Sequence, residues 1–168
     1  ECPAVVIACQ SPSDCFETAF TACKIALEFM MPVILLSDGY IANGSEPWKL
    51  PKLESLSDIQ TKIVKGFNDE SFSPYKRDEK KLSRPWAIPG EKGLEHRIGG
   101  LEKADVTGHV SYDPDNHHHM VELRQKKIDI IADFIPKAKP YGNDKGDLLV
   151  LGWGGTYGAI RSAVEKSN

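Results

Sequence analysis

The sequence predicts an α/β chain in which parallel strand–helix–strand units near the two ends are joined by a long irregular connection. Two observations lead to this prediction. Short apolar runs of strand length lie next to amphipathic helical patterns near both ends, and prolines and glycines crowd the segment between them. We therefore expect regular secondary structure near both ends and little of it in the middle, apart from one helix.

The N-terminal unit begins with the apolar run at residues 4–9, which is rich in β-branched residues and predicts a central strand buried on both faces. Residues 11–14 (SPSD) then provide a capping hydroxyl, a first-turn proline and an acid, so we expect a helix to begin there. The run at 33–36 predicts a second strand, and this order implies a right-handed parallel crossover. Apolar residues at helical spacing predict the buried stripe of the helix, which consists of Phe16, Ala19, Phe20, Cys23, Ala26, Leu27 and Met30.

The segment at 46–145 predicts an extended connection that wraps over neighbouring domains or subunits, since a structureless stretch of this length is unusual inside a compact domain. Within it, Asp113 and Pro114 predict the start of a helix at about 116–135, which ends before Pro136. After this segment, residues 147–151 (DLLVL) predict another buried strand. The glycine-rich turn Gly152–Gly158 and a helical pattern at 159–166 follow that strand.

The composition excludes several classes of protein. At ~150 residues per domain, 168 residues allow one domain or two incomplete ones. The 21 Lys and Arg residues against 24 Asp and Glu residues give a net charge of −3, which provides no basic field for nucleic acid or for an anionic membrane. The apolar stretch at 25–36 is interrupted by Glu28 and Pro32 and is too short to span a bilayer. We expect neither nucleic acid nor a membrane as a partner.

The four cysteines, Cys2, Cys9, Cys15 and Cys23, all precede residue 24 and form no CxxC pair. We interpret them as buried thiols in a reducing cytoplasm, and metal or iron–sulfur ligation is the alternative. The chain starts at Glu1 without an initiator Met and stops soon after a helix has begun. We therefore expect it to be an internal piece of a longer protein.

Four features could carry chemistry. Gly152–Gly158 lies between a strand and a helix and could bind a phosphate, although its glycine spacing fits a tightly packed turn better than the nucleotide fingerprint. Ser37–Tyr40 follows a parallel strand, at the sheet edge where ligands bind, although a strand-end turn is favoured there. His117–His119 could bind a metal, but consecutive helical residues do not share a face, so a solvated turn is favoured. His96 and His109 are interpreted as surface or interface hydrogen-bonding residues.

Three long segments resemble one known family. They read SPSDCFETAFTACKIALEFMMPVILLSDGYIANGSEPWKLP, RPWAIPGEKGLEHRIGGLEKADVTGHVSYDPDNHHHMVELRQKKI and GDLLVLGWGGTYGAI. Their order and content resemble the α subunits of 2-oxoglutarate:ferredoxin oxidoreductases, within the 2-oxoacid:acceptor oxidoreductase family. The resemblance is weakest at 54–83. GSEPWKLP and GLEHRIGGLEK resemble the 2-oxoglutarate branch of the family more than the pyruvate branch.

The resemblance implies a thiamine diphosphate enzyme that oxidatively decarboxylates a 2-oxoacid, transfers the acyl group to coenzyme A and passes electrons through iron–sulfur clusters to ferredoxin. It implies a β subunit that holds the diphosphate and magnesium, an oligomeric holoenzyme and a cytoplasmic location. None of these cofactors is expected to be bound by the present residues. The alternative functions are a nucleotide-binding module built on Gly152–Gly158 and a structural or subunit-interaction module.

The resemblance also implies a division into parts of two thiamine-enzyme-type domains. Residues 1–45 correspond to the C-terminal part of the pyrimidine-binding domain, 46–145 to the connecting segment, and 146–168 to the start of the transketolase C-terminal-like domain. In the family, the activating glutamate and the substrate-binding motifs precede the position of Glu1. We therefore assign no catalytic, cofactor-binding or metal-binding residue to this sequence. We expect the incomplete sheets to have exposed edges, so that the isolated chain either packs its two α/β pieces into one composite sheet or associates through those edges.

Overall fold

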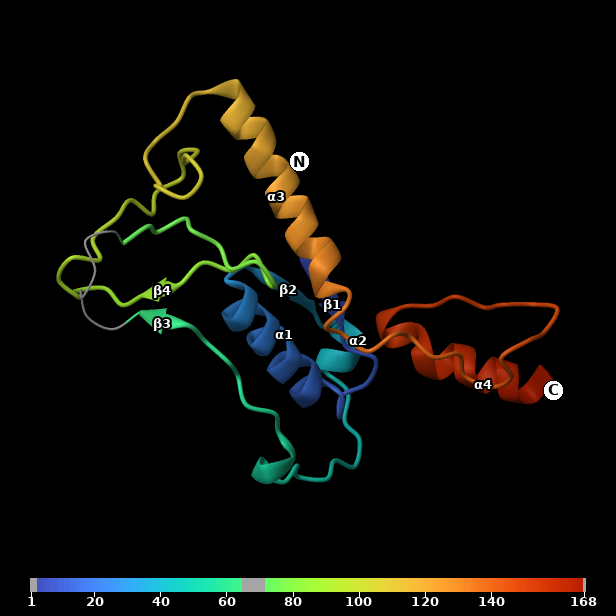
Figure 1. The fold of residues 1–168 in the computed structure, drawn as a ribbon. Helices are drawn as coiled ribbons and strands as arrows, with labels where there is room; N and C mark the ends of the chain where they lie inside the picture. The colour runs from blue at the N-terminus through green and yellow to red at the C-terminus, as the bar shows by residue number, and fades with distance from the viewer. Residues whose placement is uncertain (1–2, 65–71, 168) are drawn as a thin grey trace. The chain divides into compact units, whose positions relative to one another are not determined.

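A computed structural model describes residues 3–64 and 72–167 (Figure 1). The chain divides into two compact units that interleave along the sequence. Unit 1 consists of residues 1–4, 24–32 and 59–135, and unit 2 consists of residues 5–23, 33–58 and 136–168. The predicted α/β class is confirmed, because short parallel strands alternate with helices.

The N-terminal strand–helix–strand unit forms as predicted. Strand β1 (Val5–Ala8) pairs in parallel with β2 (Val33–Leu36), and the register places Val5 opposite Val33 and Ala8 opposite Leu36. Helix α1 (Cys15–Phe29) makes the connection between the two strands. The backbone N–H of Cys9 donates to Leu36 O at 3.1 Å, which extends the ladder beyond the last strand residue.

Helix α1 begins later than predicted, at Cys15, because residues 11–14 form a separate turn before it. The Asp14 carboxylate closes this turn. Its Oδ2 accepts hydrogen bonds from the Gln10 N–H at 3.0 Å and from the Thr18 hydroxyl at 2.9 Å. Ser11 Oγ accepts a bond from the Asp14 N–H at 3.4 Å, so the expected serine cap serves the turn and not the helix.

The predicted buried stripe of α1 does not coincide with the side of the helix that packs, so this prediction is wrong. Phe16, Cys23 and Leu27 are exposed. The reason is that α1 is apolar on two sides, so spacing alone could not select the packed side. Phe16 on the outer side packs against Trp48, with ring centroids 5.7 Å apart. The side that packs consists of Thr18, Ala22, Ile25, Glu28 and Phe29.

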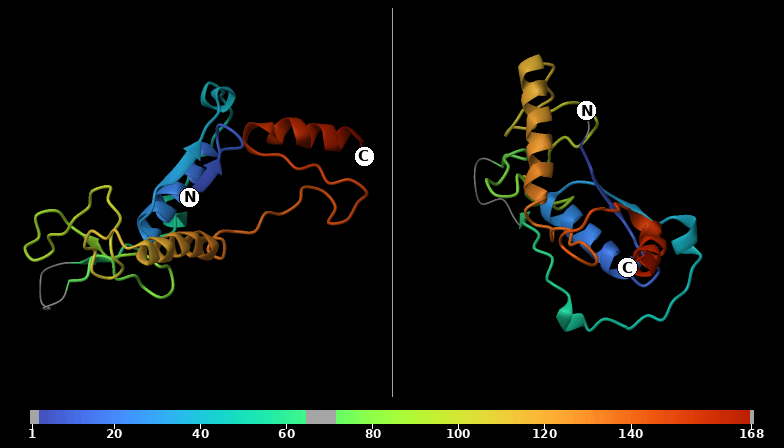
Figure 2. Two further views of the ribbon diagram at one scale, coloured as in Figure 1. Left: turned by 90° about the horizontal axis from the view of Figure 1, so that it is seen from above. Right: turned by 90° about the vertical axis from the view of Figure 1, so that its right-hand side faces the viewer.

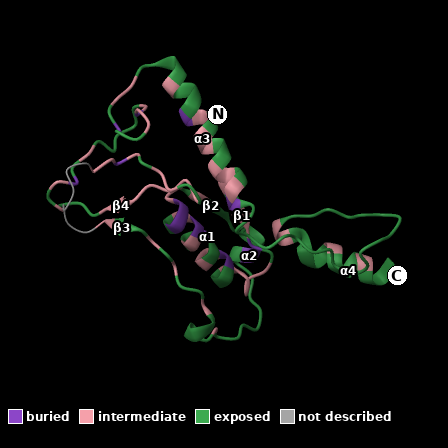
Figure 3. Cartoon of the chain, viewed as in Figure 1, coloured by how far each residue is buried: buried purple, intermediate pink, exposed green. Residues whose placement is uncertain are grey.

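The two strands that were predicted to be buried are not buried in the described residues. In β1, Val6 is 45% exposed, and the run at 147–151 forms no strand and is exposed throughout, with Leu151 90% exposed (Figures 2 and 3). A parallel strand is buried on both faces only when other strands and helices flank it. In the described ranges the sheet of β1 and β2 has two strands, so these apolar side chains lack such neighbours.

The other elements are short, except for two helices. Helix α3 (Pro114–Ile131) begins as predicted, with Pro114 in the first turn and the Asp113 carboxylate accepting from the Asp115 N–H at 3.0 Å, but it ends before the expected residue 135. Helix α4 (Tyr157–Ser167) confirms the helical pattern near the C-terminus. Between residues 3 and 167, leaving out 65–71, no helix is long and apolar enough to cross a membrane. The remaining elements are α2 (Gly39–Ala42), η1 (Leu53–Ser55), β3 (Ile63–Val64), β4 (Trp86–Ala87) and η2 (Gly154–Thr156).

The C-terminal end of α1 organises unit 1. The Leu27 carbonyl accepts a hydrogen bond from Trp86 Nε1 at 2.8 Å. The buried Glu28 carboxylate accepts from the Gln60 N–H at 3.0 Å and from Lys81 Nζ at 2.6 Å. Burial opposes ionisation of Glu28, but the bonds from Lys81 and Gln60 outweigh it, and the pKa of Glu28 lies below its usual value. Three distant segments thus attach to one helix end.

We predict that Glu28→Gln in the full-length subunit lowers the free energy of unfolding at pH 7 by about 1–3 kcal/mol, because Lys81 loses a charged partner at a buried position. Since the pKa of Glu28 is lowered in the folded state, its stabilisation is complete above the unfolded value and is lost as the pH falls through the folded value. Urea denaturation over a series of pH values should therefore show the largest difference from wild type at pH 7 and a smaller one as the pH falls through the folded pKa. Glu17→Gln, at an exposed position of α1, is the control, and equal effects of the two substitutions would contradict the prediction.

Candidate functional site

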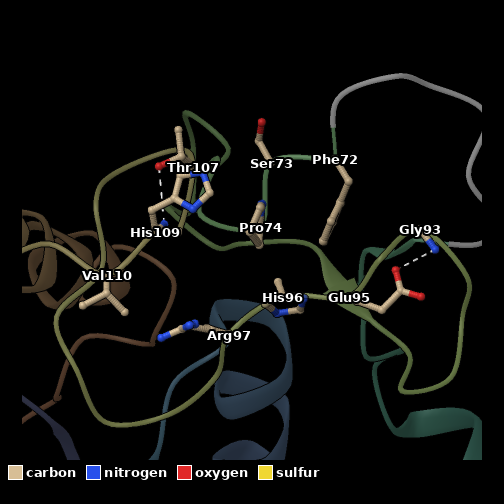
Figure 4. Close-up of a pocket in the computed structure, with 11 residues that line it drawn as sticks. Phe72, Ser73, Pro74, Gly93, Glu95, His96, Arg97, Thr107, His109 and Val110 are labelled. Carbon is tan, nitrogen blue, oxygen red and sulfur yellow. Dashed lines mark hydrogen bonds between the residues drawn. The ribbon is translucent and has the colours of Figure 1, made fainter.

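A pocket of about 700 Å³ lies within unit 1, where three loop segments come together (Figure 4). The segments are 72–74, 93–97 and 107–110, and the pocket is open to solvent. The residues that line it are Phe72, Ser73, Pro74, Gly93, Glu95, His96, Arg97, Thr107, Gly108, His109 and Val110. Most of these side chains are polar, and they include one guanidinium, two imidazoles and one carboxylate.

Local hydrogen bonds shape the pocket walls. His96 Nδ1 lies 2.8 Å from the Leu94 carbonyl, and its ring meets the Phe72 ring edge-on at a centroid distance of 5.5 Å. The Gly93 N–H donates to Glu95 Oε2 at 2.8 Å. Gly108 has a φ of +72°, and a Cβ there would lie 2.7 Å from the Tyr75 ring. A residue other than glycine at position 108 would therefore displace this wall.

Helix α3 fastens the loop that carries Thr107 and His109. Asn116 donates from Nδ2 to the Lys103 carbonyl at 2.9 Å and accepts from the Asp105 N–H at 3.1 Å. The buried Lys103 donates from Nζ to the Gly99 and Leu101 carbonyls. The bonds of Asn116 attach residues 103 and 105 to the start of α3, and the bonds of Lys103 hold residues 99 and 101 nearby. The pocket wall that follows in the sequence therefore has a defined position.

The histidine run His117–His119 lies in the first turns of α3 and contributes to the same attachment. His117 Nδ1 lies 2.9 Å from Glu102 Oε2, and His119 Nε2 lies 3.2 Å from Asp105 Oδ2. Burial opposes ionisation of Glu102, but His117 and Arg124 outweigh it and keep the pKa of Glu102 below its usual value. The described residues contain no group of three or more His, Cys, Asp or Glu side chains that could hold a metal ion.

Arg97 gives the pocket a donor for an anionic group, and the Glu95 carboxylate, which also lines the pocket, is engaged by the Gly93 N–H. Arg97 can donate in a planar fork to a carboxylate or a phosphate, and imidazoles and hydroxyls can add further donors. His96 and His109 come from loops with no regular pattern, so their convergence could not be derived from spacing. The signal available in the sequence was the glycines that flank both histidine segments, which permit close loop packing.

A second feature lies in unit 2, where the carboxyl end of β2 meets the glycine-rich turn. Asp38 caps helix α2, because its Oδ1 accepts from the Ile41 N–H at 2.8 Å. A Cβ on Gly155 would lie 3.1 Å from Asp38 Cγ and would clash with its Oδ2. Gly154, with a φ of +61°, approaches Ala8 at the end of β1. The strand-end motif and the glycine turn, which the sequence presented separately, are in contact.

This contact favours one of the two interpretations of the glycine turn. The Asp38 carboxylate lies against Gly155, just before the start of α4, where a bound phosphate would need to approach. Two negative groups there would repel each other, so the turn does not fit a diphosphate. Close packing at Gly155, and at Gly152 beside Ile160 Cδ1, favours the interpretation as a tightly packed turn.

The cysteines differ in their exposure. Cys9 is buried, and burial raises the pKa of its thiol. Cys15 is half-buried, and its Sγ donates to the Ser11 carbonyl. The prediction of a buried thiol is wrong for Cys23, which α1 turns to solvent, and Cys2 lies outside the described residues.

Comparisons with known proteins agree with one another. The model of the family described as pyruvate flavodoxin/ferredoxin oxidoreductase, thiamine diphosphate-binding, matches residues 1–112. The chain is 50% identical over 168 residues to the 2-oxoglutarate oxidoreductase subunit KorA of Mycobacterium tuberculosis, with 99% of this chain and 25% of that protein covered. It is 31% identical to subunit alpha of 2-oxoacid:ferredoxin oxidoreductase 1 of Sulfurisphaera tokodaii, with 100% of this chain and 27% of that protein covered.

A solved structure is also similar. It is the 2-oxoglutarate:ferredoxin oxidoreductase from Magnetococcus marinus with 2-oxoglutarate, coenzyme A and succinyl-CoA bound. The match has a TM-score of 0.80 and 28% sequence identity, and it covers 98% of this chain and 28% of that chain. The present chain therefore spans about a quarter of the length of the proteins that it matches.

We predict that Gly155→Ala destabilises the contact between the turn and Asp38, because the added Cβ clashes with the carboxylate. The melting temperature of the full-length subunit should fall. Gly158→Ala is the matched control, since a Cβ at Gly158 meets nothing within 4 Å and helix α4 tolerates alanine well. The prediction would be contradicted if Gly155→Ala melted at the same temperature as Gly158→Ala.

Proposed function

Because this chain belongs to the pyruvate flavodoxin/ferredoxin oxidoreductase family, we propose that it forms part of the α subunit of a 2-oxoacid:ferredoxin oxidoreductase with 2-oxoglutarate as its substrate. The observation that carries this proposal is the 50% identity, over almost the whole chain, to a 2-oxoglutarate oxidoreductase subunit. The structural match to an oxidoreductase that binds 2-oxoglutarate and coenzyme A supports the same assignment.

In the proposed reaction, 2-oxoglutarate is oxidatively decarboxylated, its acyl group is joined to coenzyme A, and ferredoxin receives the electrons. Thiamine diphosphate, when bound, supplies the carbanion stabilisation that decarboxylation requires. We place the diphosphate, magnesium and iron–sulfur clusters outside the present residues, in the β subunit and in other parts of the holoenzyme. The Asp38 carboxylate beside Gly155 supports this placement, because it opposes an anion at the glycine turn.

We propose that residues 1–45 and 146–168 contribute to the pyrimidine-binding and transketolase C-terminal-like domains, with 46–145 as the connection between them. The exposed side chains of Leu50 and Leu53 support a role of this connection in contacts with the β subunit or with another copy. The complex is assigned to the cytoplasm. A nucleotide-binding module is less well supported, because the Asp38 carboxylate lies against Gly155 in the glycine turn.

The pocket around Arg97 is proposed to hold an anionic group of a substrate. Each ligand of the Magnetococcus marinus oxidoreductase carries carboxylates or phosphates, and the guanidinium is the strongest donor of the pocket. Binding there positions a ligand and needs no reacting group from this chain.

The assignment of substrate is tested on the purified full-length complex with a viologen dye as the electron acceptor. We expect coenzyme A-dependent reduction with 2-oxoglutarate at a kcat/KM at least tenfold above that with pyruvate. The absence of dye reduction with every 2-oxoacid tested would overturn the assignment to this enzyme class, whereas a preference for pyruvate would overturn the substrate only.

Arg97→Gln is expected to raise one KM, for 2-oxoglutarate or for coenzyme A, by about tenfold, because a charge-assisted hydrogen bond contributes ~1.5–3 kcal/mol. The value of kcat should change less than twofold, since Arg97 is not placed at the reacting atoms. The substrate whose KM rises identifies the anion that binds. Lys92→Gln, at a nearby exposed position outside the pocket lining, is the control, and unchanged KM values for both substrates in Arg97→Gln would refute the pocket.

A further inference from the structure

His96 lies in the wall of the pocket with its ring held in one orientation (Figure 4). Its Nδ1 lies 2.8 Å from the Leu94 carbonyl, and its ring meets the Phe72 ring at an interplanar angle of 65°. The carbonyl has a fixed position, because Leu94 is buried and its N–H donates to the Glu91 carbonyl at 3.2 Å. A half-buried ring with these two contacts has little freedom to turn.

The bond to Leu94 determines which ring nitrogen of His96 carries the proton. A carbonyl oxygen can only accept a hydrogen bond, so Nδ1 must be the donor. In the neutral ring, Nε2 therefore has a lone pair and no proton, and it has no partner among the described residues. A second proton can be added only at Nε2. That proton converts Nε2 from a neutral acceptor into a cationic donor.

The charges around the pocket nearly balance when its histidines are neutral. Besides His96, the titratable and charged side chains of the lining are Glu95, Arg97 and His109. The wall at 72–74 contributes none, and Arg84 lies behind it, where it donates to the Pro74 carbonyl at 3.3 Å. One carboxylate against one guanidinium leaves the lining without net charge, so a proton on His96 makes the lining positive.

We propose that His96 is a specificity-determining residue of the pocket, whose protonated ring binds an oxyanion through Nε2, so that the pocket takes up a proton when its ligand binds. This inference rests on the proposed function, in which the pocket holds an anionic group of a substrate. Arg97 and His96 then bind separate oxygens. The two carboxylates of 2-oxoglutarate and the phosphates of coenzyme A both offer such oxygens, and the experiment distinguishes between them.

The fixed ring of His96 links anion binding to protonation, whereas His109 needs no such link. The lone pair of a neutral Nε2 repels an anionic oxygen, but an imidazolium donates a charge-assisted hydrogen bond to it. In the part of the chain that the structure describes, no bond fixes the His109 ring, so a neutral His109 can turn an N–H toward an anion. Since an imidazole ordinarily gains its second proton between pH 8 and pH 5, the affinity for the anion should increase as the pH falls through this range.

The test is isothermal titration calorimetry on the purified full-length complex, with coenzyme A and with glutarate as separate ligands. Glutarate has the two carboxylates of 2-oxoglutarate but cannot be decarboxylated. Titrations at pH 7 in two buffers of different ionisation enthalpy give the number of protons taken up per ligand bound. For one of the two ligands we expect an uptake of about half a proton, and a Kd about threefold or more lower at pH 6 than at pH 8. The ligand that shows this uptake is the source of the anion.

Two substitutions of His96 separate its two nitrogens. In His96→Gln the side-chain amide replaces Nε2 and donates without a proton, so the uptake of a proton should be lost; subtracting this variant from wild type also cancels any titration of the ligand itself. In His96→Asn the amide replaces Nδ1 and keeps the bond to Leu94, so the melting temperature should stay close to that of wild type while the Kd at pH 6 rises about threefold or more. His118→Gln removes a histidine outside the pocket lining and is the control, with unchanged proton uptake.

Several results would overturn the inference. It is refuted if neither ligand binds, if neither shows proton uptake in wild type, or if His96→Gln keeps the uptake of wild type. An uptake that disappears in His109→Gln but persists in His96→Gln would assign the proton to the opposite wall. The viologen assay on the same preparation reports the proposed function separately. A complex that is inactive toward 2-oxoacids but takes up a proton through His96 contradicts the enzyme class and not the site.

Discussion

The C-terminal end of α1 is the constraint on which unit 1 depends. A helix leaves its last carbonyls without intrahelical partners, and a helix end in a folded protein must find donors for them. Here Trp86 and Lys127 supply donors to the carbonyls of Leu27 and Phe29, and Glu28 adds a carboxylate that binds Lys81. The need to supply donors to these carbonyls therefore brings together segments that have little regular structure of their own.

Polar bonds, more than a large apolar core, determine the geometry of the pocket. The loop that carries His109 is fixed to α3 by Asn116 and by a histidine–carboxylate pair at His117. Among the residues of unit 1 that the structure describes, the buried apolar ones are Ile25, Phe29, Leu94, Met120 and Ile131. A site built in this way depends on the correct ionisation of its carboxylates, and the lowered pKa of Glu102 shows how burial is compensated there.

The elements that follow from local rules could be predicted from the sequence. The proline-initiated helix at Pro114 and the crossover between β1 and β2 formed because capping and periodicity act within a few residues. The packed side of α1 could not be predicted, since Phe16 and Ile25 lie on different sides of an equally apolar helix. The contact of Asp38 with Gly155 and the convergence of His96 with Arg97 and His109 depend on tertiary packing, which no local pattern encodes.

The wide sequence separation of the partners of α1 has a consequence for the order of events during synthesis on the ribosome. In the sequence, Lys81 follows its partner Glu28 by 53 residues, and Lys127 follows its partner Phe29 by 98 residues. At about 5–20 residues per second, the last of these donors emerges roughly 5–20 s after the helix end that it satisfies. During this interval water must solvate the Phe29 carbonyl, and the Phe29 ring lacks Phe134 as its neighbour. The nascent chain thus exposes an unpaired carbonyl and an uncovered aromatic ring, to which chaperones can bind, until α3 has left the exit tunnel.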